Sequence, residues 1–82
     1  MDMPTDTKEN TIRARVRRSE DFEPGSLRTI AIDETNGISQ VIGKLKGATT
    51  TTGQSLIFDK RVKNWTQALV EGWLRDHGLE VV

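Results

Sequence analysis

The chain has 82 residues, which is enough for one small domain and too few for two hydrophobic cores. Its 12 basic and 12 acidic residues balance, so the net charge does not favour a general polyanion binder. With no cysteine and one histidine, the chain excludes disulfides, cysteine zinc sites, thiol catalysis and a histidine-pair mechanism. Apolar residues make up only 34%, so we expect marginal to moderate stability, or reliance on a partner.

Residues 1–10 are polar, contain Pro4 and show no apolar period, which predicts a disordered N-terminal arm followed by a single domain over 11–82. These residues also differ from a signal peptide. No apolar run approaches the roughly 20 residues that a membrane-spanning helix needs. We therefore expect a cytoplasmic protein with no membrane partner.

Apolar and basic residues alternate over Thr11–Arg18, which predicts a half-buried strand with an arginine-lined outer face. An acidic segment over Ser19–Ser26 follows, and its Pro-Gly pair indicates a turn. Phe22 lies inside this segment, and we expect its ring to fold back onto the core.

Two further strands are predicted, over Arg28–Asp33 and Ile38–Leu45. The Asn-Gly dipeptide between them favours a two-residue type I′ turn, in which both residues have positive φ. That turn would place Ile32 opposite Val41. The following segment, Lys46–Gln54, holds four consecutive threonines between glycines and is predicted to be a flexible loop.

Ser55–Phe58 is a short apolar run that predicts a fourth strand, although the sequence leaves open whether it joins the sheet. Asn64–His77 is predicted to be a helix with Asn64 as its N-cap. Gly78 is expected to end it in a left-handed conformation, with Leu79 folding back onto Leu74. The fold class is therefore α+β: a small antiparallel sheet of three to four strands with one C-terminal helix packed on one face.

Catalytic chemistry finds little support in the sequence. His77 lies at the helix end, where it is expected to complement the helix dipole or to pack. The carboxylates near Glu20–Glu23 lie in a loop without calcium-loop spacing, so solvated turn residues are favoured over a weak cation site. The glycine-threonine loop lacks the G-K-[ST] ending of a phosphate loop. We predict no enzyme, no metal, no cofactor and no small-molecule substrate.

The helix offers a candidate protein-contact surface. Its apolar arc is wide and the predicted sheet is narrow, so one edge of the helix is expected to remain uncovered. The predicted protein-contact face consists of Trp65, Val70, Trp73 and Leu74.

Basic residues form an alternative, nucleic-acid surface. A sheet face that presents arginines, joined by a basic loop, fits a DNA major groove. The zero net charge and the lack of an aromatic ladder count against it, and cross-strand pairing with acids is the simpler interpretation. The candidate nucleic-acid contacts are Arg13, Arg15, Arg17, Arg18, Lys60, Arg61 and Lys63.

Four segments carry a resemblance to a known kind of protein: R-A-R-V-R-R-S-E-D-F-E-P-G-S-L-R-T, V-I-G-K-L-K-G, Q-S-L-I-F-D-K and N-W-T-Q-A-L-V-E-G-W-L-R-D-H-G. Together they resemble a small uncharacterised domain of bacteriophage, prophage and archaeal mobile-element proteins. They are also similar to segments that accompany phage prohead-protease-type proteins. The resemblance covers about residues 11–78 and implies a mobile-element origin and a shared fold. It carries over no functional residue.

These observations predict a small non-enzymatic binding or assembly module, of phage or prophage origin, that acts through a protein partner or through self-association. The rival prediction is a small nucleic-acid-binding domain. A small sheet followed by a helix also resembles, in outline, the arm-type DNA-binding domains of phage integrases, although a fold does not determine a function.

Overall fold

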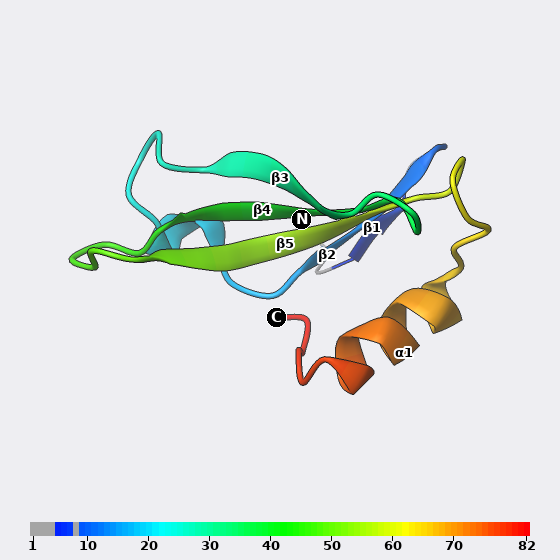
Figure 1. The fold of residues 1–82 in the computed structure, drawn as a ribbon. Coiled ribbons are helices and arrows are strands. Elements are labelled where there is room, and N and C mark those ends of the chain that lie inside the picture. Colours follow the sequence, from blue (N-terminus) through cyan, green and yellow to red (C-terminus); the bar gives the residue numbers. More distant parts are fainter. Residues whose placement is uncertain (1–4, 8) are drawn as a thin grey trace.

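The computed structural model describes residues 5–7 and 9–82, with side chains from residue 9 onward. It contains one antiparallel sheet and one helix (Figure 1). The elements in chain order are β1 (Thr5–Thr7), β2 (Thr11–Arg15), a short 3-10 helix (Ser19–Asp21), β3 (Arg28–Asp33), β4 (Ile38–Lys44), β5 (Thr51–Asp59) and α1 (Gln67–Asp76). The strand order is β1-β2-β5-β4-β3, so β1 and β3 are the two edges. The predicted α+β class, with an antiparallel sheet and a C-terminal helix, is confirmed.

The described sheet has one strand more than the sequence predicted. Part of the predicted disordered arm, Thr5–Thr7, forms β1 and pairs with β2, with Thr7 opposite Ile12. The open edge of β2 offers backbone N–H and C=O groups that a short segment can satisfy by adding a strand. Residues 1–4 and 8, the rest of that predicted arm apart from Glu9 and Asn10, lie outside the described residues.

The core lies between α1 and the β2–β5 part of the sheet (Figure 1). Phe58 of β5 is fully buried, and its ring meets Trp65 and Trp73 edge-on at centroid distances of 4.8 and 5.5 Å. Edge-to-face aromatic pairs add to the free energy of burying the rings themselves. The buried members of this core are Ile12, Ala14, Ile38, Leu56, Phe58, Trp65, Val70 and Leu74.

The central strand is β5, which lies between β2 and β4 and is longer than the sequence indicated. Ser55–Phe58 does join the sheet, and Thr51–Gln54 extends the same strand instead of forming part of a flexible loop. The threonines of this segment are β-branched and fit a pleated strand, and their pairing with β4 holds them in the extended conformation. Gln54 is an extra residue in the ladder, because Val41 pairs with Ser55 and Ile42 with Gly53.

Phe22 is buried, as predicted, but it packs apart from the helix-side core. Its backbone forms a bridge with Leu45, and its ring lies over Gly43. Gly43 and Ile38 are an odd number of residues apart on β4, so they face opposite sides of the sheet. Ile38 faces the core under α1, and Phe22 therefore covers the opposite face. A Cβ at residue 43 would lie 3.0 Å from the Phe22 Cδ2 and 2.8 Å from the Leu27 Cδ2, which explains the glycine.

The β3–β4 turn differs from the predicted type I′ turn. Residues 34–37 form a four-residue connection, Asp33 pairs with Ile38, and Ile32 does not lie opposite Val41. The Asp33 carboxylate accepts hydrogen bonds from the backbone N–H and the Nδ2 of Asn36, at 3.2 and 2.8 Å. These bonds lower the pKa of Asp33 and hold Asn36 at negative φ, so only Gly37 is left-handed, with φ +70°.

The two ends of α1 differ in how well the sequence predicts them. Thr66, not Asn64, is the N-cap, and its side chain accepts from the Leu69 N–H at 3.2 Å. The predicted C-terminal end of the helix is confirmed: Gly78 has φ +70°, and the Leu79 N–H donates to the Leu74 carbonyl at 2.8 Å.

Replacing Gly37 should destabilise the domain more than replacing another left-handed glycine. A Cβ at residue 37 would lie 2.7 Å from the Val62 Cβ, whereas Gly47 has φ +79° and open space around it. Both alanine variants meet the left-handed penalty of about 1–2 kcal/mol. Gly37→Ala adds overpacking, so it is expected to lose about 1–3 kcal/mol more than Gly47→Ala in urea unfolding. Equal losses would mean that residues 59–62, which lie against Gly37, shift at little cost in free energy.

Candidate functional site

Most of the predicted protein-contact face is part of the core. Trp65, Val70 and Leu74 keep only 6%, 0% and 4% of their surface exposed. The Trp65 indole Nε1–H also donates to the Asn36 carbonyl at 2.8 Å, which fixes the ring beneath the β3–β4 turn. These three residues are not accessible in the folded chain, because the sheet presents a wider apolar face to α1 than a short fourth strand would allow.

Trp73 is the one member of that predicted face that is partly exposed. Its ring packs on Phe58 on one side and stacks on His77 on the other, at a centroid distance of 3.8 Å. The His77 Nδ1 lies 2.7 Å from the Trp73 carbonyl, which agrees with the predicted packing role of this histidine at the helix end. The large apolar residue that α1 exposes is Leu69.

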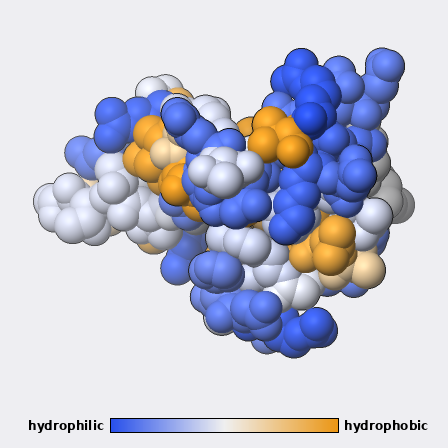
Figure 2. All heavy atoms as spheres, turned by 45° about the vertical axis from the view of Figure 1, so that its right-hand side comes forward, coloured by the Kyte–Doolittle hydropathy of each residue, from blue (hydrophilic) through white to orange (hydrophobic). Residues whose placement is uncertain are grey.

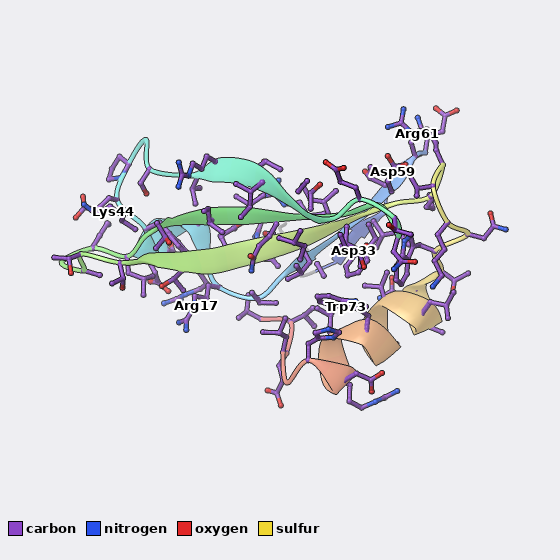
Figure 3. All side chains as sticks on the ribbon, viewed as in Figure 1. Arg17, Asp33, Lys44, Asp59, Arg61 and Trp73 are labelled. Atoms are coloured by element: carbon purple, nitrogen blue, oxygen red, sulfur yellow. The ribbon has the colours of Figure 1, made fainter. Side chains whose placement is uncertain are left out.

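The predicted basic surface divides into separate parts. Arg17 lies on the α1 side of the sheet and lines an open groove of about 330 Å³ with Gln40 and Leu79. Arg61 lies at the opposite end of the molecule (Figure 3). The Arg17 N–H donates to the Gln54 carbonyl, and the Lys60 N–H donates to the Asn10 carbonyl. Gln54 and Lys60 are six residue steps apart along β5 and the residue that follows it. At about 3.3 Å per residue this is about 20 Å.

Several of these cations already interact within the chain. Arg18 lies 3.4 Å from a Glu20 carboxylate oxygen, and Arg61 binds Asp59 through two hydrogen bonds of 3.1 and 3.0 Å. The bonds from Arg61 hold the pKa of Asp59 below its usual value. The Lys63 ammonium lies over the Trp65 ring, 4.8 Å from its centroid.

The β2 arginines face away from α1, as their alternation with Ile12 and Ala14 requires, but they are half-buried. Arg13 donates from Nη2 to the Gln54 Oε1 at 3.0 Å. The same Oε1 accepts from the Ser55 hydroxyl, and the Gln54 Nε2 donates to the Ser19 Oγ at 2.8 Å. Arg13 is therefore part of a hydrogen-bond network around the fully buried side chain of Gln54.

The edge of the sheet at Leu27–Asp33, which we call the β3 edge, is exposed, and no element among the described residues covers it. Arg28 to Ile32 are all exposed, and Leu27, Ile30 and Ile32 keep 39%, 37% and 42% of their surface. Figure 1 shows β3 along the upper edge of the sheet and α1 below the sheet. On the face shown in Figure 2, apolar side chains form separate patches among hydrophilic ones.

The backbone of the β3 edge is available for pairing at alternate residues. The Lys44 N–H donates to the Ser26 Oγ at 3.1 Å, and the Lys44 carbonyl accepts from the Glu23 N–H at 2.7 Å. Even-numbered residues of β4 therefore direct their backbone groups toward β3. Since Thr29 and Ala31 lie opposite odd-numbered residues, their N–H and C=O groups point outward. A β-bulge at Ile32 ends this regular edge.

No protein-family model matches this chain, and no curated protein or solved structure matches it either. The resemblance to mobile-element domains therefore stays a prediction. Over residues 5–7 and 9–82, no helix is long and apolar enough to cross a membrane. Within the same described residues, no group of three or more His, Cys, Asp or Glu side chains could hold a metal ion.

Substitution of two leucines of α1 should distinguish the buried face of the helix from its exposed face. Leu74 is 4% exposed and Leu69 is 48% exposed. Leu74→Ala removes buried methyl groups and leaves a cavity, so it is expected to lower the free energy of unfolding by about 2–5 kcal/mol. Leu69→Ala should change it by less than about 0.5 kcal/mol. Chemical denaturation of both variants tests this, and equal effects would contradict the burial of the predicted contact face.

Proposed function

We propose that this chain is a small non-enzymatic binding and assembly module that recognises an extended protein strand at its β3 edge. The observation that carries the proposal is the exposure of Arg28 to Ile32 along β3, at the edge of the sheet. An open strand edge presents unsatisfied backbone donors and acceptors, which a second extended chain satisfies by adding to the sheet.

The side chains of β3 support recognition of a protein strand. Ile30 and Ile32 are exposed β-branched residues beside the outward backbone groups of Thr29 and Ala31. In strand addition the backbone supplies affinity, and alternate side chains supply selectivity. The bulge at Ile32 limits the acceptor to a few residues, which favours a short and reversible contact over extended aggregation.

The nucleic-acid alternative has weaker support. DNA binding depends on several cations that contact phosphates along one surface. Here Arg18 and Arg61 face carboxylates of their own chain, and Arg17 and Lys60 lie at opposite ends of β2. The zero net charge removes a long-range attraction as well.

Peptide selection tests strand recognition without a known partner. A displayed library of random peptides is selected on the immobilised domain, and the selected peptides are then measured on variants. Ala31→Pro removes an outward N–H and places a ring on the acceptor edge while leaving the backbone groups that face β4. We expect this variant to bind the selected peptides at least about tenfold more weakly, equivalent to about 1.4 kcal/mol.

The control is Leu69→Lys, which removes an exposed apolar residue from α1 and should leave peptide binding unchanged. Circular dichroism of both variants checks that they remain folded. Equal binding by the wild type and Ala31→Pro would reject β3 as the acceptor.

Titration of labelled protein with a mixed-sequence DNA duplex tests the alternative. We expect no salt-sensitive amide shifts at Arg17, Arg18 or Lys60–Lys63, because no continuous row of free cations exists in the part of the chain that the structure describes. Binding whose logarithm falls by about 0.9 per phosphate contact with the logarithm of salt would instead support a nucleic-acid function.

A further inference from the structure

We infer that the strand accepted by β3 is β3 of a second copy, so that two chains form one continuous ten-stranded antiparallel sheet across a two-fold axis. The inference rests on the proposed function and names the partner. Its basis is the order of charges along β3, the position of the outward backbone groups and the distance of α1 from this edge.

The charges of β3 complement themselves in the antiparallel direction. The strand begins at Arg28 and ends at Asp33, which Glu34 follows. Antiparallel pairing of two copies places Arg28 of each beside the acidic end of the other, whereas parallel pairing would place like charges side by side. Neither Arg28 nor Glu34 forms an ion pair with another residue among those the structure describes, so both remain available.

Symmetry selects a register centred on Ile30. A two-fold axis perpendicular to the sheet places the helices of both copies on the same face of the joined sheet. Each β3 residue then lies opposite a residue of the second copy whose side chain points to the same face. With Ile30 opposite Ile30 of the second copy, Thr29 lies opposite Ala31 on both sides of the axis. These are the residues whose N–H and C=O groups point outward, so the register satisfies them mutually.

Apolar contact reinforces this register. Ile30 pairs with Gln40, and Gln40 pairs with the buried Leu56, so Ile30 lies on the α1 side of the sheet. Across the axis, the Ile30 side chains of both copies would meet on that side and lose exposed surface. A contact of one strand edge buries less than a standard interface, so the dimer should form and dissociate with concentration.

The helix does not obstruct the second copy. It packs on β2 and on Phe58 of β5, and β4 lies between β5 and β3. At about 4.8 Å per strand, the edge lies about 14 Å from β2.

Sedimentation equilibrium of the full chain, from low micromolar to millimolar concentration, tests the dimer. The expected mass rises from the 9.2 kDa of one chain toward twice that value. Ile30→Lys places two ammonium groups together at the axis and should keep the chain monomeric, as should Ala31→Pro. Leu69→Lys is the control and should dimerise like the wild type. A monomer at every concentration would overturn the inference.

A charge exchange tests the antiparallel order. Arg28→Glu should weaken the dimer by placing three acidic residues near one another, and adding Glu34→Arg should restore it, since long side chains reach diagonal neighbours across strands. Failure of the double variant to recover dimerisation would contradict the charge order proposed here.

Cysteine cross-linking tests the register, because the natural chain has no cysteine. Ile30 faces itself at a position without direct hydrogen bonds, where Cα atoms lie about 4.5 Å apart, within the range of a disulfide. Under mild oxidation, two Ile30→Cys thiols lose two protons and two electrons to the added oxidant and form one S–S bond. Ile30→Cys should give covalent dimers faster than Leu69→Cys, and equal rates would contradict the register.

These outcomes separate the two proposals. A chain that stays monomeric but selects peptides through Ala31 loses the self-pairing inference and keeps the strand-binding function. A chain that dimerises equally well with Ala31→Pro associates through another surface, which overturns the self-pairing inference. Equal peptide binding by the wild type and Ala31→Pro is the separate result that rejects the strand-binding function.

Discussion

The packing of Phe58 against two tryptophans holds the architecture together. Phe58 lies near the end of β5, the strand that β2 and β4 both pair with, and its ring meets Trp65 before α1 and Trp73 within it. A chain with few aromatic residues thus concentrates three of its four at one point. The Trp65 Nε1–H bond to Asn36 joins this point to the β3–β4 turn, so the helix, the central strand and the turn are fixed together.

This concentration also explains why one edge stays bare. One ten-residue helix covers about the width of the β2–β5 pair, and the sheet extends two strands further. Phe22 and Leu27 cover Gly43 from the opposite face, but the structure brings no element over β3. The exposure of Ile30 and Ile32 follows from a small core that is placed off-centre.

Local signals predicted much of this fold. The sequence indicated the bounds of β3, most of β4 and the left-handed Gly78 at the helix end, because alternation and glycine preference act over a few residues. It misplaced the N-cap by two residues, since Thr66 and Asn64 are both good caps and only packing decides between them. It also missed the Asp33 bonds to Asn36, which override the usual conformation of an Asn-Gly pair.

Local sequence signals could not predict which surfaces of the domain are exposed. Trp65 and Leu69 are both apolar, and strand order, which is non-local, determines that one is buried and the other exposed. The β3 edge carried a usable signal: its centre, Thr29 to Ile32, is uncharged and its ends have opposite charge. That pattern becomes meaningful only when β3 is known to be an edge.

The two edges of the sheet differ in a way that bears on assembly. A symmetric β3 pair uses the same surface twice, so it closes and leaves only the β1 edges outside. Thr5–Thr7 is three residues long, which makes β1 a poor template for further strands. The bulge at Ile32 limits β3 as well. In the proposed dimer, a strand edge that would otherwise promote open-ended aggregation is thereby confined to a contact between two copies.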